Sequence, residues 1–357
     1  MNNSIKKGVV VAVILLFVSV SVIPSTGTNV VEKTSNVSFN GNTLYVGGNG
    51  TGNYSKIQDA INDSSNGDTV FVFDDSSPYY EYIEVDKSII LEGENKYTTI
   101  ISGFGLNQHI VRITGDEGKF HGFTIQNSNT MYRGIFVTSN DNNIFGNILT
   151  NVGGGIKLKD VSNNKIHENE IRNSKGYYSG IGLQSSSYNS ILNNNVKEFY
   201  FGILVEDHSC NNKVSGNEVV DVGSIGIAVT GDCNFNIVSL NYVSQTKEEA
   251  ILVTFYNFFN LIYRNNIVDN RGYGVYLSNA NFAIVKNNNF INNSCNAYFF
   301  VKRYTNLWIR NYWDNRNIPF GPQKIEGKDH SPWLPGEYVS REQYDWFPSR
   351  KPYNIGV

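Results

Sequence analysis

Charged residues are scarce in this sequence: only 17% of the 357 residues are Asp, Glu, Lys or Arg, and the formal net charge is −3. A nucleic-acid-binding domain needs a strongly basic patch, so this composition excludes that class and we expect no nucleic-acid partner. Three cysteines, Cys210, Cys233 and Cys295, are too few for a disulfide scaffold and lack the spacing of a metal site. After the N-terminal segment, no apolar run is long enough to cross a bilayer.

The N-terminal segment has the pattern of an export signal. Lys6 and Lys7 precede an uncharged apolar run over residues 9–18, which small residues follow. We therefore predict a signal peptide over residues 1–27, a linker over 28–40, and an extracellular or cell-surface location. An uncleaved membrane anchor is the alternative, because the apolar run approaches the lower length limit of a membrane span.

An internal repeat dominates the rest of the chain. A phrase of the form Asn-x-apolar-x-x-Asn-x-apolar returns every 22 to 25 residues. Its second asparagine recurs at Asn147, Asn169, Asn194, Asn217, Asn241, Asn265, Asn288 and Asn311. Its first recurs at Asn142, Asn164, Asn189, Asn212, Asn236, Asn260 and Asn306, with Ala283 as the exception. A repeat kept in register over eight units indicates a solenoid.

A second marker, a small residue followed by an alternating apolar segment, opens each repeat. It occurs at Gly134, Gly155, Gly180, Gly202, Gly226, Ala250 and Gly274. Apolar residues at a period of two indicate strands with one buried face, and the short segments leave no room for ordinary helices. We predict an all-β fold, a single-stranded right-handed parallel β-helix of about 11 coils over residues 41–313, whose equivalent strands stack about 4.8 Å apart.

The repeated asparagines have a structural explanation. Asparagine tolerates the left-handed bend between two strands of a coil, and stacked amides can hydrogen-bond to those above and below them. We therefore expect an asparagine ladder and assign these residues no catalytic role.

Both ends of a β-helix need a cap, because they expose an open sheet and the apolar core. At the N-terminus, Ile57, Ala60 and Ile61 lie at helical spacing within residues 54–63, which predicts an amphipathic helix. At the other end, all four tryptophans and six of the eight prolines lie after residue 305. We predict that residues 314–357 form an irregular C-terminal cap.

Six segments carry a resemblance to known proteins: Tyr45–Gly48, Tyr54–Ile61, Gly67–Val72 and Lys87–Glu94 near the start, and Asn311–Asp314 with Ile325–Pro332 near the end. They resemble the NosD-like family of pectin-lyase-like β-helix proteins. The resemblance covers nearly the whole chain after the export signal and is specific for architecture. It implies a surface or periplasmic β-helix, whereas the superfold hosts lyases, hydrolases, esterases and noncatalytic modules alike.

Two departures from the family bear on metals. Relatives carry an Asp-rich, calcium-loop-like insert after the Asn-Tyr-Trp motif, whereas residues 315–323 contain no Asp or Glu. The family name implies copper, yet Met131 is the only methionine after the signal and the histidines are scattered singly. We therefore predict no metal site and no cofactor, neither Ca²⁺ nor copper.

Chemistry is expected on the outward face of the strand that opens each coil, where alternate side chains form a groove suited to an extended polymer. Polar and charged residues collect there in three consecutive coils: Lys157, Lys159, Asp160, Gln184, Glu206, Asp207 and His208. Asp160 lies about two rungs, roughly 10 Å, from Glu206 or Asp207, which is near the upper limit for an inverting acid and base pair.

We name Asp160, Glu206, Asp207, Lys157 and Lys159 as candidate catalytic residues, the lysines as a base or charge stabiliser for an acidic sugar. The alternative is a solvated face on which lysines and carboxylates pair across rungs.

Aromatic residues supply candidate sugar-stacking platforms. We assign substrate binding to Gln184 and His208 together with Tyr178, Tyr200 and Tyr276. Further rings cluster in the turns, at Tyr177, Phe199, Phe201, Phe255, Tyr256, Phe258 and Phe259. If exposed, these rings could stack on sugar faces; alternatively, they seal the corners of the core.

Two questions stay open at this stage. Cys210 and Cys233 lie about one coil apart, which allows either a disulfide or two buried free thiols. For function, we predict a noncatalytic cell-surface protein that binds a polysaccharide or envelope glycan, or that serves as a structural module. A polysaccharide lyase or glycoside hydrolase acting on an extended acidic polysaccharide is one alternative. A periplasmic copper-binding module is the other, by family analogy alone.

Overall fold

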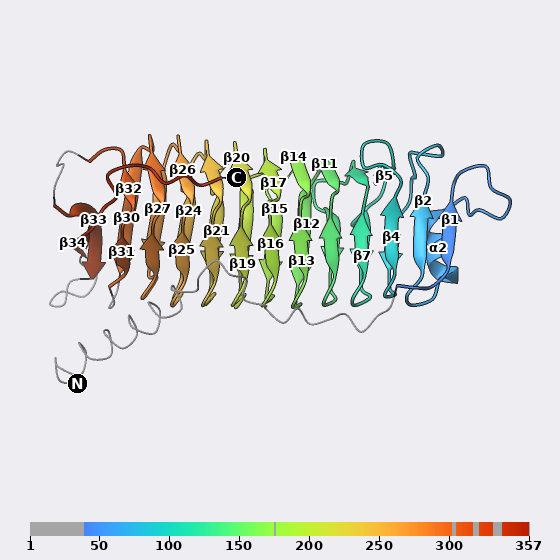
Figure 1. Ribbon diagram of the computed structural model, residues 1–357, viewed down its shortest axis with the longest axis horizontal. Coiled ribbons are helices and arrows are strands. Elements are labelled where there is room, and N and C mark those ends of the chain that lie inside the picture. Colours follow the sequence, from blue (N-terminus) through green and yellow to red (C-terminus); the bar gives the residue numbers. More distant parts are fainter. Residues whose placement is uncertain (1–38, 175, 302–304, 317–320, 331–337, 357) are drawn as a thin grey trace, which may run out of the picture. The chain divides into compact units, whose positions relative to one another are not determined.

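The computed structural model describes residues 39–356 except for residues 175, 302–304, 317–320 and 331–337. The predicted signal peptide and nearly all of the predicted linker lie outside these residues. The described chain forms a right-handed parallel β-helix of about 12 turns, which confirms the predicted fold class (Figure 1). Within the described residues, no helix is long and apolar enough to span a membrane.

Each turn contributes up to three short strands, and equivalent strands pair in parallel to form three stacks. The first stack consists of β3 (Ile83–Val85), β6 (Val111–Ile113), β9 (Arg133–Val137), β12 (Gly154–Lys159), β15 (Ser179–Gln184), β18 (Phe201–Glu206), β21 (Ile227–Thr230), β24 (Ile251–Thr254), β27 (Tyr273–Ser278), β30 (Cys295–Val301) and β33 (Gln323–His330). The second consists of β1 (Thr43–Val46), β2 (Thr69–Val72), β4 (Ile90–Gly93), β7 (Lys119–His121), β10 (Asn143–Phe145), β13 (Lys165–His167), β16 (Ser190–Leu192), β19 (Lys213–Ser215), β22 (Ile237–Ser239), β25 (Leu261–Tyr263), β28 (Ile284–Lys286), β31 (Leu307–Ile309) and β34 (Tyr338–Asp345). The third consists of β5 (Ile100–Ser102), β8 (Thr124–Gln126), β11 (Ile148–Val152), β14 (Glu170–Ser174), β17 (Asn195–Lys197), β20 (Glu218–Val220), β23 (Tyr242–Ser244), β26 (Asn266–Val268), β29 (Asn289–Ile291) and β32 (Tyr312–Trp313).

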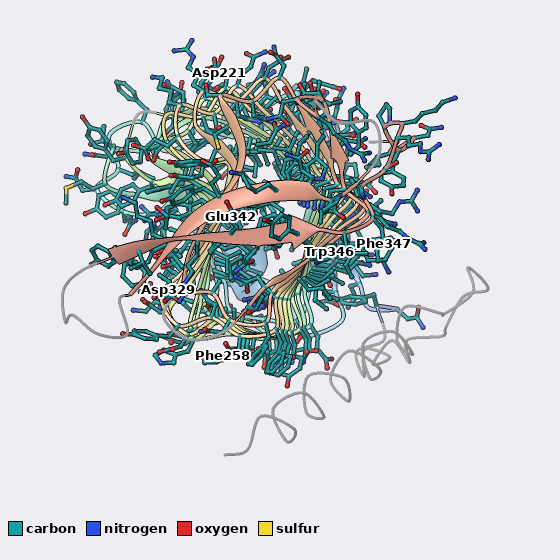
Figure 2. All side chains as sticks on the ribbon, turned by 90° about the vertical axis from the view of Figure 1, so that its left-hand side faces the viewer. Asp221, Phe258, Asp329, Glu342, Trp346 and Phe347 are labelled. Carbon is teal, nitrogen blue, oxygen red and sulfur yellow. The ribbon has the colours of Figure 1, made fainter. Side chains whose placement is uncertain are left out.

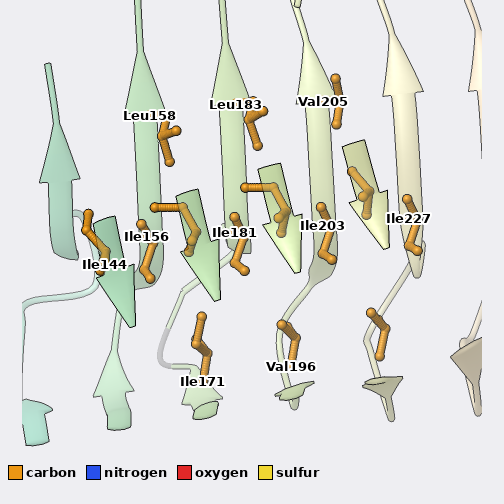
Figure 3. Packing of buried hydrophobic residues seen from close by; sticks show 14 of the residues in the cluster. Ile144, Ile156, Leu158, Ile171, Ile181, Leu183, Val196, Ile203, Val205 and Ile227 are labelled. Atoms are coloured by element: carbon orange, nitrogen blue, oxygen red, sulfur yellow. The ribbon is translucent and has the colours of Figure 1, made fainter. Parts of the chain in front are cut away.

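Side-chain alternation explains why these segments are strands. In second-stack strands such as β13 and β16, the middle residues Ile166 and Ile191 are fully buried, while their neighbours point outward. In the first stack, the parallel register aligns Ile156, Ile181 and Ile203 in one inward row (Figure 3). Burying such a side chain stabilises the fold by about 1.5–3 kcal/mol, so these rows supply the main driving force.

The asparagine ladder is present. Asn217 is fully buried, and its Oδ1 accepts hydrogen bonds from both the backbone N–H and the Nδ2 of Asn194, each at 3.0 Å. Its own Nδ2 donates to the Ile191 carbonyl at 2.9 Å and to Asn241 Oδ1 at 3.0 Å. Each ladder amide therefore satisfies buried backbone and side-chain groups of the neighbouring coils.

The prediction that the ladder asparagines themselves adopt the left-handed bend is wrong. The bend falls on the residue before each of them. At the corner between the second and third stacks, the bend residues before the eight ladder asparagines are Gly146, Glu168, Asn193, Gly216, Leu240, Arg264, Asn287 and Arg310. The ladder amide closes this bend: Asn169 Nδ2, for example, donates to the His167 carbonyl at 3.0 Å, across Glu168. The inward amide holds the turn, and the bend residue itself can vary.

The N-terminal cap is the predicted amphipathic helix, α2 (Ile57–Asp63), whose Ile57, Ala60 and Ile61 are buried. Glu81 caps its N-terminus, because the two carboxylate oxygens accept hydrogen bonds from the backbone N–H groups of Ile57 and Gln58 at 3.0 and 3.1 Å. A carboxylate at this position satisfies N–H groups that have no partner inside the helix.

The C-terminal cap corrects the prediction of an irregular segment. Strands β33 and β34 form a regular antiparallel hairpin, which lies across the end of the coils (Figure 2). Strand β33 continues the first stack by pairing with β30, and the Trp308 indole N–H donates to Gln343 Oε1 at 2.8 Å. A hairpin pairs backbone groups that an irregular segment would leave open at the edge of the sheet.

After the hairpin, the chain returns along the third stack. The Asn289 amide both accepts from the Tyr353 backbone N–H at 2.8 Å and donates to the Tyr353 carbonyl at 2.9 Å. Asn266 Nδ2 donates to the Ile355 carbonyl at 3.0 Å. This segment is therefore held by side-chain amides of successive coils.

All three cysteines are free thiols. Cys233 is buried, and its Sγ accepts from the Ser209 backbone N–H at 3.2 Å and donates to the Thr230 carbonyl at 3.1 Å. Burial raises the pKa of Cys233 to about 12. Cys210 forms separate bonds, donating to the Asp232 carbonyl at 3.4 Å. The two thiols therefore serve as hydrogen-bonding groups in the turns.

Candidate functional site

The predicted site residues lie on the outer face of the first stack. Strands β12, β15 and β18 pair in register, which places Lys159, Gln184 and Glu206 in one lateral row. Lys157 and Gly182 fall in the adjacent row. Because the inward residues of these strands are fixed in the core, the outward ones are held about 4.8 Å apart from coil to coil.

Arg133, which the sequence analysis did not select, is a central residue of this face. Its side chain passes directly over Gly154, and its guanidinium carbon lies 3.4 Å from the centroid of the Tyr178 ring. A Cβ at position 154 would approach Arg133 Cδ to 2.5 Å, so the glycine makes room for the cation. Burial lowers the pKa of Arg133, and its buried Nε has no hydrogen-bond partner among the described residues.

Lys157, one coil further along, also lies across a glycine of the neighbouring coil. Its stem passes over Gly182 of the next coil, and its Nζ donates to Glu206 Oε1 two coils away at 2.6 Å. The residue is only 8% exposed, which is unusual for a lysine on an outward row. Two long cations, Arg133 and Lys157, thus lie flat on the face above glycines.

The structure brings together some of the other predicted residues. Gln184 Nε2 donates to Asp207 Oδ2 at 2.8 Å, and His208 Nε2 lies 3.8 Å from Asp232 Oδ2 at an exposed position. Asp160 lies in the turn after β12, where its backbone N–H donates to the Gln184 carbonyl at 3.0 Å. Lys159 is exposed in the outer row, and the described structure gives neither its side chain nor that of Asp160 a hydrogen bond or ion pair.

The predicted tyrosines fall into two separate groups. Tyr178 stacks on Arg133, and Tyr200 lies nearby with ring edges against Tyr177 at 5.6 Å and Phe201 at 4.8 Å. Tyr276 lies three coils beyond Glu206, where it packs against other tyrosine rings. The structure does not join Tyr276 to the polar region.

This arrangement is suited to recognition. The carboxylates proposed as an acid and base are engaged, Glu206 by Lys157 and Asp207 by Gln184. The half-buried Arg133 guanidinium and the exposed rings near Tyr178 offer hydrogen-bond donation and stacking, the two contacts by which proteins hold sugars. Tyr177 is 83% exposed and Tyr200 is 36% exposed, so these rings are accessible to a ligand.

One group of turn aromatics does not offer a stacking platform. Phe235, Phe259 and Phe282 stack on one another, with centroids 5.3 and 5.2 Å apart and ring planes within 12° and 10° of parallel. Their faces cover each other, so the ladder presents ring edges, whereas a sugar stacks on a ring face. Phe199 is only 2% exposed and seals the core.

His109 makes the stability of this face depend on pH. Its ring stacks on Phe136 at 4.5 Å, and its Nδ1 accepts from the Arg133 backbone N–H at 3.0 Å. Burial, with Arg133 and Arg112 nearby, lowers the pKa of His109 to about 4.

Between pH 6.5 and 4 the unfolded chain therefore binds a proton at His109 that the folded chain does not bind. The free energy of unfolding should fall as the pH drops through this window. His109→Gln, which keeps an acceptor but does not titrate, should make the fall shallower in urea unfolding at pH 7, 6 and 5. His208→Gln, at an exposed position, serves as the control. If the free energy of unfolding fell equally steeply with pH in His109→Gln and in the parent protein, His109 would not be the group responsible.

The fold defines a class: a right-handed parallel β-helix. The family model described as periplasmic copper-binding protein (NosD) matches residues 61–254, and the chain belongs to this family. Comparison with curated proteins found no match.

Among solved structures, the A-module of mannuronan C-5 epimerase AlgE4 from Azotobacter vinelandii is 15% identical, with a TM-score of 0.59 over 72% of this chain and 82% of that chain. The Dettilon tailspike protein is 15% identical, with a TM-score of 0.57 over 79% of this chain and 65% of that chain. The catalytic domain of a GH87 α-1,3-glucanase is 12% identical, with a TM-score of 0.55 over 78% of this chain and 54% of that chain. At these identities the likeness establishes the fold.

The copper in the family's description does not fit the donors that the structure describes. Among the described residues, no three His, Cys, Asp or Glu side chains gather to hold a metal ion. His121 and His167 are separated by the Phe145 ring, which stacks on them at 4.4 and 5.0 Å. Met131 is 69% exposed. We therefore derive no chemistry through copper.

Proposed function

We propose that this protein is a noncatalytic extracellular or cell-surface module that binds an extended polysaccharide along the outer face of the first stack. The observation that carries the proposal is the pair of flat cations. Arg133 is half-buried and its guanidinium lies on the Tyr178 ring, beside the exposed rings of Tyr177 and Tyr200, while Lys157 neutralises Glu206. A hydroxyl or carboxylate oxygen of a sugar would accept hydrogen bonds from the terminal N–H groups of Arg133.

The structural neighbours support this choice of ligand class. By their names, one acts on mannuronan and another on α-1,3-glucan, so the fold accommodates polysaccharides. Glu206 is paired with Lys157, and Asp207 accepts a hydrogen bond from Gln184. These contacts favour binding over cleavage, because a general acid or base must be available to the reacting bond.

The test is to incubate the purified protein with immobilised acidic and neutral polysaccharides and to follow retention and product release together. We expect retention without release. Arg133→Gln should weaken retention on neutral polysaccharides at least tenfold, whereas Arg172→Gln should leave it unchanged. Arg172 is the matched control, because it lies on β14 of the third stack and pairs with Glu170 at 3.3 Å.

Two outcomes would overturn the proposal. Product release that disappears in a Glu206→Ala, Asp207→Ala double variant would make the protein an enzyme. Absence of retention on every polysaccharide would leave a structural role. Circular dichroism of each variant separates loss of binding from loss of folding.

A further inference from the structure

A regular row of lysines crosses the outer face of the second stack. The parallel register of β7, β10, β13, β16 and β19 aligns Lys119, Asn143, Lys165, Ser190 and Lys213. A lysine therefore occurs in every second coil, with a small polar residue between, and successive lysines lie about 10 Å apart, which is two coil spacings. We call Lys119, Lys165 and Lys213 the lysine row.

The charges of the lysine row are not neutralised within the described part of the chain. None of the three lysines forms an ion pair there, whereas Lys157 pairs with Glu206 and Lys324 with Glu326. Lys165 and Lys213 are exposed, and the Lys119 ammonium lies 4.6 Å from the centroid of the Phe39 ring. In a chain with a net charge of −3, this is a local concentration of positive charge.

The adjacent row forms a flat floor beside these cations. His121, Phe145 and His167 stack on one another, with centroids 4.4 and 5.0 Å apart. Burial lowers the pKa of both histidines; Glu92 acts to raise that of His121 and Lys119 to lower it, while Lys165 acts to lower that of His167 and Glu168 to raise it. Glu168 lies at the edge of this floor, 3.4 Å from His167 Nδ1.

We propose that the lysine row binds a linear polyanionic glycan that lies along the helix axis and carries one negative charge per disaccharide. The spacing of the lysines suits such a polymer, because the two sugars of one disaccharide in an extended chain span a length comparable to two coils. The row lies on a different stack from Arg133, so this site is independent of the one proposed above.

The spacing argues against nucleic acid as the ligand. Duplex DNA carries a charge about every 1.7 Å along its axis, and proteins that bind it present dense clusters of cations. Three lysines about 10 Å apart on rigid strands match a sparse charge repeat.

The experiment measures the affinity of the purified protein for hyaluronan, which has one carboxylate per disaccharide, with dextran as the neutral polymer. We expect binding to hyaluronan that weakens with added salt, and none to dextran. Replacing Lys119, Lys165 and Lys213 together by glutamine should weaken it at least tenfold. Glutamine at Lys56, Lys197 and Lys247, which lie elsewhere, makes the same change in net charge and should alter affinity less than twofold.

A second variant tests the spacing itself. Lys165→Ser combined with Ser190→Lys keeps every charge on the row but places the lysines three coils and one coil apart. We expect at least a fivefold loss of affinity for hyaluronan.

Equal losses in the two glutamine triples, wild-type affinity in the swap, or no binding of hyaluronan by the parent protein would each overturn the proposal. The Arg133→Gln variant, measured in the same assay, distinguishes the lysine row from the first-stack site. It should bind hyaluronan as the parent protein does. Loss of that binding with Arg133→Gln alone would assign the polymer to the first stack instead.

Discussion

Replacing Asn217 by alanine should lower the free energy of unfolding by about 2–5 kcal/mol, because it leaves buried groups without partners. The Asn194 backbone N–H would lose its acceptor, Asn217 Oδ1, and the Ile191 carbonyl would lose its donor, Asn217 Nδ2. Both Asn217 and Asn194 are almost completely buried, so water has little access to replace these bonds. Urea unfolding followed by circular dichroism measures the effect.

Two further variants make this prediction specific. Asn195→Ala removes a half-buried asparagine whose Nδ2 donates to Glu218 Oε2 on the outer face, and it should cost less than about 1 kcal/mol. Asn217→Asp keeps an acceptor for Asn194 but directs a second oxygen at the Ile191 carbonyl. Burial should raise the pKa of this aspartate above its unfolded value, so the variant should be most stable at low pH and lose stability as the pH rises. Similar costs for the alanine variants at 217 and 195 would contradict the ladder's role.

Replacing Asp345 by alanine should release the C-terminal hairpin from the last coil. Asp345 is completely buried, and it occupies the position that the next ladder amide would take. Its carboxylate accepts from the backbone N–H groups of Arg310 at 2.9 Å and Asn311 at 2.8 Å, and from the Trp313 indole N–H at 3.1 Å. Hydrogen bonds to a charged group contribute about 1.5–3 kcal/mol each, so we expect a loss of about 3–5 kcal/mol, concentrated at this end.

The measurement is hydrogen exchange in β30 and β31 together with tryptophan fluorescence, because Trp308 and Trp313 are buried beneath the hairpin. Asp345→Asn retains one acceptor and should show an intermediate effect. Glu342→Ala is the control on the same hairpin: its exposed pair with Lys324, at 3.4 Å, contributes little. Unchanged exchange in Asp345→Ala would show that the cap is held by its apolar contacts alone.

Most of the fold could be predicted from the sequence because each coil repeats the same alternation of apolar residues and the same buried asparagine. The period of two located the inward residues, and Gly155 marked a corner where a Cβ would collide with the Gly180 carbonyl of the next coil. The helix at Ile57–Asp63 followed from its spacing. The form of the C-terminal cap could not be predicted in the same way, because β33 and β34 are defined by pairing with each other and with distant strands.

The candidate site was predictable in position but not in its contacts. The register that aligns Lys159, Gln184 and Glu206 follows from the repeat. Arg133 was missed because it precedes the alternating segment, and no periodic pattern indicates that its side chain crosses Gly154 to reach Tyr178.

The sequence by itself determined the solenoid, its inward rows and its asparagine ladder, because these depend on properties that every coil repeats: side-chain alternation and a buried amide at a constant interval. Only the tertiary structure decided which long side chains lie over which glycines, where the bends fall, and how Asp345 ends the ladder. These features depend on the stacking of particular residues from different coils, and a repeat pattern contains no information about individual contacts between them.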